Sequence, residues 1–475
     1  MNQWRWFNMV LILNSALIGG CLSNPTPITL QAQLPPQFSH SGKHPLPDKW
    51  WEAFEDQNLN TLIDLGLEHN PSLLATWDRL RQAEAVLSRE GAARFPSLNG
   101  TLNASRSRDN NGRETDRFQL GLAAAYELDL WGRVRANTTA AQFDAEASDA
   151  DVQTAGLTLS AEIAKAWYNM TEQRGQLALL NRQIATNEKV LHLVTLRFRQ
   201  GVAGAADVLR QRQLIEQTRG ETKDVVARIE TLSHQLAILV GQPPQAIHLP
   251  REESLLMIPP LPATGLLVEF LQRRPDVKGN FYQVQAADAR IAAAIADRFP
   301  RIDLTGSLTT NLSSTLTGGS FATAPAGLFS SWLATVATQV VAPLIDAGAR
   351  AAEVERREAL LSEALNNYES TVLQAIREVE DALSREAQQR EKTASLEQQF
   401  HLATQVIQRL RGRYIQGATA YIDVLNALVS QQVLERQILT ARRNLIDFRV
   451  DLARALAGGW ELKKPEVREL TSSAG

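Results

Sequence analysis

Cysteine is almost absent from this 475-residue chain, which contains only Cys21. The chain therefore has no Cys-x-x-Cys pair, and it also has no His-Glu-x-x-His helix motif. Its nearest match to a phosphate loop, Ser41-Gly42-Lys43, has Gln37 where that loop requires glycine. The seven histidines are scattered along the chain. These absences argue against an enzyme, so we expect no catalytic residues, no cofactor and no metal site.

An excess of basic charge is also missing, since the formal net charge is -3. This balance argues against a nucleic-acid-binding protein, which would carry a basic surface. After the first 20 residues, no apolar run is long enough to span a bilayer as a helix. The apolar content of 44% with few aromatic residues suits long helices with narrow packing stripes.

Proline is missing from two long stretches, Trp131–Val240 and Leu344–Lys464. The first stretch predicts a helix over 131–200, a tight turn over 199–204, and a helix over 205–240 that runs back. The 131–200 helix would be roughly 100 Å long at a rise of about 1.5 Å per residue. A seven-residue apolar series predicts that it packs along a coiled-coil-like stripe, formed by Ile163, Met170, Leu177, Ile184, Leu191 and Phe198.

The proline-free stretch occurs twice, because adding 216 to each number finds a second copy. Gly132 becomes Gly348, and Asp207-Val208-Leu209 becomes Asp423-Val424-Leu425. Further upstream the offset is 204, so that Pro71 and Pro96 correspond to Pro275 and Pro300. We expect a helix after the first proline of each pair, with proline in its first turn.

Period-two alternation of apolar with polar or small residues follows each second proline. It predicts strands over 98–105 and 118–129 in the first copy, and over 301–309 and 332–340 in the second. The second copy has twelve extra residues, mainly in the loop 313–330. This alternation fits a transmembrane barrel strand and also a half-buried strand of a soluble sheet.

The N-terminus favours the membrane interpretation. An apolar run follows Arg5 and predicts a signal peptide over 1–20. The sequence Ile-Gly-Gly before Cys21 matches the bacterial lipoprotein cleavage box, so we predict acylation of Cys21, by palmitate for example. The alternative is an ordinary signal peptide with a chance cysteine. Residues 22–47, rich in Pro, Ser, Thr and Gln, are expected to form an extended tether.

Four strands in a bilayer would leave two open sheet edges, which lipid does not allow. The chain must therefore oligomerise, and three copies would supply the twelve strands of a plausible closed barrel. The helices would continue this barrel as a tube. By length, the returning helix 205–240 and the next copy's helix 274–298 together match one long helix, so we expect them to lie end to end against it.

These features together resemble the TolC-type outer-membrane efflux family, in its lipoprotein branch that serves multidrug pumps of the resistance-nodulation-division type. The resemblance spans about residues 48–458. It rests on the paired proline units, the two turns, Asp48-Lys49-Trp50-Trp51 with Phe54 and Asp56, and Tyr126-Glu127-Leu128-Asp129-Leu130-Trp131-Gly132-Arg133. We expect Trp50 and Trp51 to anchor the core and not to bind a ligand.

The resemblance implies a mixed, mainly α-helical fold, with coiled-coil hairpins forming an α-barrel and four transmembrane β-strands per chain closed into a twelve-stranded β-barrel as a trimer. It implies a passive exit duct in the outer membrane of a Gram-negative bacterium, lipid-anchored, with the helical tube in the periplasm. A periplasmic adaptor, an inner-membrane transporter and outer-membrane lipid would be its partners. The expected divisions are signal peptide 1–20, tether 21–47, first repeat 48–241, crossover linker 242–265, second repeat 266–458 and tail 459–475.

The resemblance also implies functional residues at the two turns. The adaptor would dock on tips that include Gln200, Gly201, Val202, Gln416, Gly417 and Ala418. Beyond the second turn, the family often carries an Asp-Val-Leu-Asp gate. Asp423 matches its first residue, and Asn426 replaces the last, so we expect a constriction at Asp423 and Asn426. The alternative role of Asp423 is a helix N-cap, which Asp207 at the matching place supports.

Two further functions remain open from the sequence. A duct that secretes whole proteins, as in type I secretion, would share this architecture. A periplasmic coiled-coil scaffold would explain the heptads, but not the signal peptide, the strand hairpins or the duplication.

Overall fold

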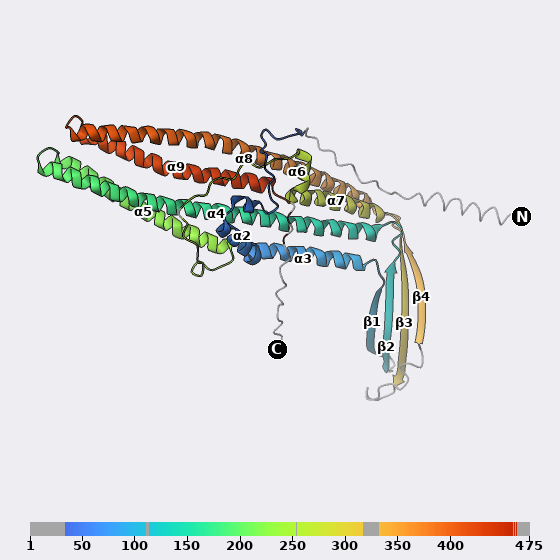
Figure 1. The fold of residues 1–475 in the computed structure, drawn as a ribbon. Coiled ribbons are helices and arrows are strands. Elements are labelled where there is room, and N and C mark those ends of the chain that lie inside the picture. The colour runs from blue at the N-terminus through green and yellow to red at the C-terminus, as the bar shows by residue number, and fades with distance from the viewer. Residues whose placement is uncertain are drawn as a thin grey trace. The chain divides into compact units, whose positions relative to one another are not determined.

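The computed structural model describes residues 34–110, 114–252, 254–316, 332–458, 460 and 462, so the predicted signal peptide and Cys21 lie outside the described residues. The chain forms two compact units. The sheet unit includes Leu80–Ser148 and Gly279–Glu369, and the hairpin unit includes Ala32–Arg79, Asp149–Lys278 and Ser370–Gly475. The elements (Figure 1) are, in order, η1 (Trp50–Phe54), α2 (Gln57–His69), α3 (Pro71–Ala92), β1 (Ser97–Arg108), β2 (Glu114–Glu127), α4 (Arg133–Arg199), α5 (Ala205–Leu239), α6 (Leu267–Arg273), α7 (Pro275–Ala296), β3 (Arg301–Leu316), β4 (Trp332–Val341), α8 (Ala349–Ile415) and α9 (Tyr421–Leu456).

The sheet unit contains one antiparallel sheet in the order β1-β2-β3-β4, so β1 and β4 are its edges (Figure 1). The two hairpins have the same register. In the first, Ser97 faces Ala125, and in the second, Arg301 faces Val341. Adding 204 to the first residue and 216 to the second converts one pair into the other. The predicted strands are confirmed, and the internal duplication extends to individual residue pairs.

One face of this sheet is apolar and exposed in the single chain. The register aligns Gly100, Leu122 and Leu308 across three strands, and Gly306 with Val336 across the last two. Side chains on this face are exposed to solvent, with exposed fractions of 69% at Leu98, 63% at Leu102, 69% at Trp332 and 79% at Val336. The opposite face carries residues such as Asn99, Thr101, Asn103, Thr305 and Ser307. The predicted alternation is therefore present in the folded sheet.

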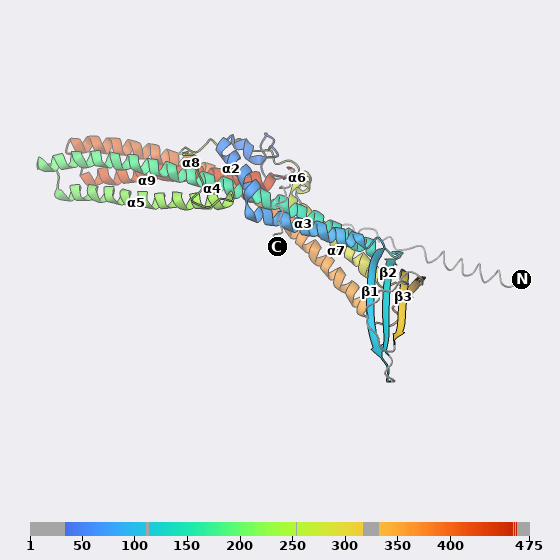
Figure 2. The same ribbon diagram turned by 90° about the horizontal axis from the view of Figure 1, so that it is seen from below.

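The helices repeat the duplication. The long helices α4 and α8 both contain 67 residues, and α3 and α7 both contain 22. In the hairpin unit, α5 runs beside α4, and α9 runs beside α8 (Figures 1 and 2). The predicted long helix, turn and returning helix are thus confirmed in both copies. Among the described residues, no helix combines the length and apolar character needed to cross a bilayer.

The predicted apolar stripe of α4 is correct only in its first part. Ile163 and Met170 are fully buried, but Phe198 is 44% exposed. Towards the turn, the buried positions of the helix include Leu180 and Val194 instead. The face of α4 that is covered changes along the helix, because Leu180 and Phe198 are 18 residues, or five full turns, apart and lie at the same angle, yet only Leu180 is buried. The first part of the helix packs against the segment around Trp50, whereas Leu191 packs against an apolar cluster near the turn.

The predicted end-to-end partner of the returning helix is wrong. The side chain of Asn70, which precedes α3, donates from Nδ2 to the carbonyl of Leu239 at the end of α5, at 2.9 Å. In the second copy, Arg274, which precedes α7, donates to the carbonyl of Ala455 near the end of α9, at 3.5 Å. Each returning helix therefore meets the short helix of its own copy. Lengths could not distinguish these partners, because α3 and α7 are equally long.

Aromatic residues after the N-terminal segment anchor the hairpin unit, as expected. Trp50 and Trp51 are 0% and 1% exposed. The indole of Trp50 donates to Ser160 Oγ at 3.1 Å, and that of Trp167 donates to Asp56 Oδ2 at 2.8 Å. Both bonds join this segment to α4, so the indole N–H groups remain satisfied inside the core.

The expected tether is bound to the folded body over part of its length. The N-terminal strap, residues 38–44, forms backbone hydrogen bonds of 2.7 and 3.0 Å with residues 262–263. Ser39 adds two bonds to the carboxylate of Glu380 on α8, at 2.9 and 2.5 Å. The strap is therefore not a free tether.

The crossover linker is fixed by a buried ion pair. Arg449 on α9 and Glu386 on α8 are each 2% exposed. The guanidinium donates to both carboxylate oxygens of Glu386, at 2.8 and 2.5 Å. Its remaining nitrogen, Nη1, donates to the carbonyls of Pro259 and Pro260. We name this arrangement the arginine clasp.

We expect Arg449→Leu to destabilise the protein, because it leaves the carboxylate of Glu386 and two carbonyls without this donor. Breaking one side of a buried pair costs about 3–5 kcal/mol when the other charge is left uncompensated. Because Arg390 still donates to Glu386 at 2.7 Å, we expect a loss near the lower end of this range. Chemical unfolding of the detergent-solubilised protein, followed by circular dichroism, measures the loss. The matched control is Arg442→Leu, which removes an exposed α9–α8 pair with Glu397 and should cost about 1 kcal/mol or less. Equal losses in the two variants would contradict the importance of the clasp.

Candidate functional site

Two turns with the same backbone geometry end the long helices. In the first, the amide of Val202 donates to the carbonyl of Arg197 at 2.9 Å, and Gly201 has φ of 75°. In the second, Gly417 also has φ of 75°, and the amide of Ala418 donates at 2.8 Å to the residue five positions before it. This is a Schellman motif, in which a left-handed residue after the helix satisfies its last carbonyls. Glycine adopts this conformation at no steric cost.

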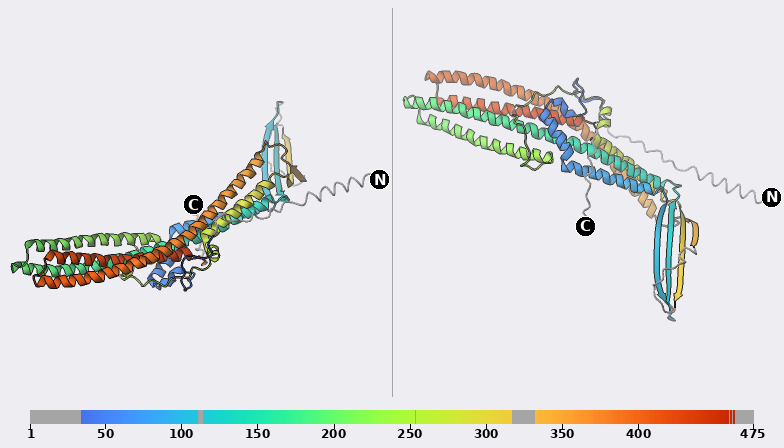
Figure 3. Two further views of the ribbon diagram at one scale, coloured as in Figure 1. Left: turned by 90° about the horizontal axis from the view of Figure 1, so that it is seen from above. Right: turned by 60° about the horizontal axis from the view of Figure 1, so that its bottom comes forward.

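Both turns lie at the same end of the hairpin unit (Figure 3). They are in contact, because Arg197 donates to the carbonyl of Ile415 at 3.3 Å and its guanidinium lies 4.5 Å from the ring centre of Tyr414. The predicted docking residues are all exposed, namely Gln200, Gly201, Val202, Gln416, Gly417 and Ala418. The structure therefore presents them together as one accessible tip.

Asp423 and Asn426 lie in the first two turns of α9, and both are exposed in the single chain. Asp423 is not the N-cap, because Ala420 occupies that position. As the third residue of the helix, it accepts a hydrogen bond from the Thr419 hydroxyl at 2.8 Å. Asp207, third in α5, instead accepts from the backbone amide of Gly204 at 3.4 Å. Both carboxylates sit where the helix dipole favours negative charge.

A buried polar network lies behind the tip, and it was not predicted from the sequence. The hydroxyl of Tyr421 donates to Gln211 Oε1 at 2.5 Å, and Gln211 donates to the carbonyl of Asn187 at 2.8 Å. The amide of Gln432 donates to Asn187 Oδ1 at 2.9 Å. Burial raises the pKa of Tyr421, so its hydroxyl remains a donor. The network joins α4 and α5 to α9, and only the polar identity of these widely separated residues could have indicated it.

Polar contacts continue along α4 and α9 away from the tip. Gln176 donates to the hydroxyl of Thr440 at 3.2 Å, and Gln183 donates to the carbonyl of Gln432 at 3.2 Å. Glu172, 1% exposed, accepts from Thr440 at 2.9 Å. We name these α4–α9 contacts the polar seam. Its hydrogen bonds join the first helical hairpin to the second.

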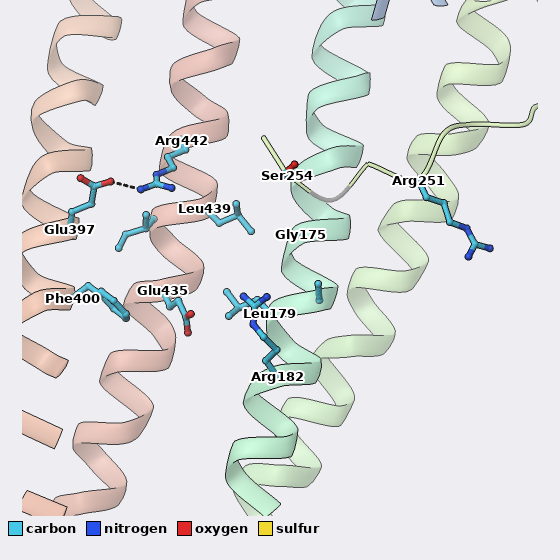
Figure 4. Close-up of a pocket in the computed structure, with 12 residues that line it drawn as sticks. Gly175, Leu179, Arg182, Arg251, Ser254, Glu397, Phe400, Glu435, Leu439 and Arg442 are labelled. Carbon is cyan, nitrogen blue, oxygen red and sulfur yellow. Dashed lines mark hydrogen bonds and ion pairs between the residues drawn. The ribbon is translucent and has the colours of Figure 1, made fainter. Parts of the chain in front are cut away.

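An open groove of about 740 Å³ accompanies the polar seam (Figure 4). Leu179 on α4 and Leu439 on α9 contribute apolar walls, and Phe400 comes from α8. Arg442 points towards Glu397 and donates to it at 2.7 Å. No residue of this groove belongs to the predicted functional set. Among the described residues, no group of three or more His, Cys, Asp or Glu side chains could hold a metal ion.

Comparison with known proteins agrees with this geometry. The family model described as outer membrane efflux protein matches residues 62–242 and 266–458. The pyoverdine export outer membrane protein OpmQ of Pseudomonas aeruginosa is 29% identical, over 96% of this chain and 97% of its own length. Outer membrane protein OprJ of the same species is 30% identical over 86% of each chain. The open-state crystal structure of the Neisseria gonorrhoeae outer membrane channel MtrE superposes with a TM-score of 0.81 at 28% identity, covering 94% of this chain and 99% of that one.

The duplicated helical hairpins and the four-stranded sheet are thus those of an outer-membrane channel protein. The chain belongs to the outer membrane efflux protein family. It is an exit duct for export, and it resides in the outer membrane of a Gram-negative bacterium with its helical part in the periplasm.

We expect Gly417→Val to distort the tip, because a β-branched residue with positive φ is strained by roughly 1–2 kcal/mol. Export should fall while the amount of protein in the outer membrane stays the same. Gly412→Val is the matched control, because Gly412 lies in the last turns of α8, just before this turn, with no positive φ and no atom within 4 Å of an added Cβ. Drug or dye efflux in cells that depend on this duct measures the effect. Full efflux by Gly417→Val would contradict a functional role for the tip.

Proposed function

We propose that three copies of the chain close into one channel, with a twelve-stranded β-barrel in the membrane and an α-helical barrel in the periplasm. The observation that carries this proposal is the sheet with two free edges. Strands β1 and β4 have no outer neighbour within the sheet, and backbone groups at an open edge cannot remain unpaired in lipid. Joining β4 of one copy to β1 of the next removes every edge. The exposed apolar face then lies against the hydrocarbon.

The channel forms the outer part of a tripartite pump. The exposed tip, from Gln200 to Val202 and from Gln416 to Ala418, docks on a periplasmic adaptor, which connects it to an inner-membrane transporter. The duct itself performs no chemistry, and selectivity for drugs or other small molecules belongs to the transporter. The similarity to OpmQ, which is named for pyoverdine export, supports small-molecule cargo.

Asp423 forms a ring of three carboxylates that narrows the periplasmic end of the channel. Its exposure and its position one helical turn from Asn426 support this role, because both side chains lie on one open face of α9. Asn426 is neutral, so only the layer of side chains formed by Asp423 carries charge. A ring of carboxylates favours cations in a pore.

We expect the protein extracted from outer membranes to have a mass near that of three lipidated chains. In a planar bilayer it should conduct in small, cation-preferring steps. Asp423→Asn should reduce the preference for cations, and Asn426→Asp should increase it, because each changes the charge of the proposed ring. A trimer whose cation preference is unchanged by either substitution would contradict the Asp423 constriction. A monomer would contradict the closed barrel.

Cys21 carries the lipid that anchors the mature N-terminus. We expect Cys21→Ala to abolish incorporation of labelled palmitate, since the chain contains no other cysteine. Cys21→Ser is the matched control, because serine keeps the size and polarity of the side chain but lacks the thiol. Labelled palmitate in either variant would place the lipid elsewhere.

A further inference from the structure

Each short helix ends in the same three-residue sequence, Arg-Phe-Pro, just before a strand begins. Arg94-Phe95-Pro96 lies between α3 and β1, and Arg298-Phe299-Pro300 lies between α7 and β3. In both segments the amides of the arginine and the phenylalanine donate to the carbonyls three residues before them, at 3.0 to 3.1 Å. The two segments therefore form one turn that occurs twice, and we name them the Arg-Phe-Pro turns.

The arginines of these turns are exposed and carry unused hydrogen-bond donors. Neither the Arg94 nor the Arg298 side chain forms a hydrogen bond or an ion pair with any residue that the structure describes. Neighbouring arginines differ, because each has a carboxylate partner: Arg89 pairs with Glu90, Arg135 with Asp129, Arg301 with Asp303 and Arg350 with Asp297. These carboxylates are already occupied, so both unpaired guanidinium groups remain available to an anion from outside the chain.

Exposed aromatic rings accompany the two arginines. Phe95 is 72% exposed and Phe299 is 41% exposed. Trp131, between β2 and α4, stacks on Phe299 with ring centres 4.8 Å apart, and its indole donates to the carbonyl of Pro300 at 2.8 Å. Aromatic side chains with an apolar face and a satisfied polar group are typical of the boundary between a membrane and water. The turns therefore have the composition of a membrane boundary.

The turns lie at one end of the sheet, at a distance from its other end that matches a bilayer. β1 and β3 begin at the same end (Figure 2), because each is antiparallel to β2. On β3, Thr310 lies opposite Trp332, which is 69% exposed, and Arg301 begins the strand nine residues earlier. Nine residues are roughly 30 Å of strand, or about 23 Å across the membrane at a tilt of about 40°. A barrel's apolar band is about 25 Å tall with aromatic girdles at both edges, so Trp332 marks one girdle and the Arg-Phe-Pro turns mark the other.

We propose that Arg94 and Arg298 bind the phosphate groups of anionic phospholipids in the periplasmic leaflet of the outer membrane. This inference rests on the proposed barrel, because the sheet must span the bilayer for the turns to meet lipid. The helical part of the chain lies in the periplasm, so the end of the sheet that adjoins the helices faces the periplasmic leaflet. A guanidinium group donates two parallel hydrogen bonds to one phosphate, and the neighbouring phenylalanine ring then contacts the acyl chains.

Charge favours phosphatidylglycerol over phosphatidylethanolamine at these sites. The ammonium group of phosphatidylethanolamine neutralises its own phosphate, whereas phosphatidylglycerol keeps a net negative charge. Each arginine near the surface of the bilayer should favour the anionic lipid by about fivefold. In the proposed barrel the Arg-Phe-Pro turns occur on every second strand, roughly 10 Å apart across the strands. The two turns in each of three copies would therefore form a continuous ring of lipid sites.

Native mass spectrometry of the detergent-solubilised trimer tests these sites. Phosphatidylglycerol and, separately, phosphatidylethanolamine are titrated against the full chain. The unchanged protein should bind phosphatidylglycerol more tightly, and the double variant Arg94→Gln with Arg298→Gln should bind it about fivefold more weakly per site. Arg94→Lys with Arg298→Lys should retain part of the binding, because lysine keeps the charge but lacks the planar fork.

Arg411→Gln is the matched control for the single variant Arg94→Gln, because each removes one exposed cation. The side chain of Arg411 is also exposed and has no partner among the described residues. It lies 62 residues beyond the start of α8, about 93 Å along the helix from the end that adjoins the sheet. Its replacement should leave the binding of phosphatidylglycerol unchanged.

Spin labelling measures where the turns lie in a bilayer. On a Cys21→Ala background, Arg94→Cys or Arg298→Cys provides the only thiol for a nitroxide label. In nanodiscs that contain phosphatidylglycerol, labels at both positions should lie at the depth of the lipid phosphates, as measured by collision with oxygen and with a water-soluble nickel complex. A label at Arg411→Cys should lie in water.

The outcomes separate the inference from the proposed function. Selective loss of phosphatidylglycerol binding in the glutamine variants, with labels at the phosphate depth, supports the lipid sites. A trimer that binds both lipids equally, or that keeps its affinity for phosphatidylglycerol in the double variant, overturns the sites and leaves the exit duct intact. Labels in bulk water on a trimer likewise overturn the sites alone. A protein that is monomeric without any substitution overturns both the sites and the closed barrel.

Discussion

The arginine clasp holds together parts of the hairpin unit that are far apart in the sequence. Arg449 and Glu386 are both removed from water, which is costly for each charge alone. The cost is offset because the guanidinium uses its planar fork on the carboxylate and its remaining nitrogen on two linker carbonyls. A lysine has no such fork and could not satisfy these acceptors in the same way. The clasp fixes the linker, and the linker in turn provides the backbone against which the N-terminal strap pairs.

The two copies use one backbone plan with different side chains. Where each short helix begins, the first copy uses Asn70 and the second uses Arg274 to reach the end of a returning helix. Arg274 makes further contacts that Asn70 does not, because it also forms ion pairs with Asp276 and Glu378. The duplication therefore preserves the contact between each short helix and its returning helix, while the side chains that form this contact differ between the copies. Only the second copy has the arginine clasp, since Ser233 stands at the matching place in the first.

Much of this fold could be predicted from the sequence, because its elements are long and local signals mark their ends. Proline at the start of α3 and α7, glycine at both turns, and strict alternation in the strands each act within a few residues. The tip residues could be located for the same reason. The predictions that were wrong, and the network that was not predicted, depended on tertiary contacts. The stripe of α4 was wrong beyond its first part because this 67-residue helix changes partners along its length, from the segment around Trp50 to α5 and α9 near the turn. The partner of α5 could not be chosen by length, and the network of Tyr421, Gln211 and Asn187 joins residues more than 200 positions apart.

The strap has a consequence for the order in which the protein matures. Ser39 is synthesised early, yet its carboxylate partner, Glu380, follows 341 positions later. The strap cannot reach its final position until most of the polypeptide has been synthesised and exported. Contacts of such long sequence separation form late and slowly. Full docking of the strap therefore requires α8, and a chain truncated before α8 would keep the strap's bonds to residues 262–263 but not those to Glu380.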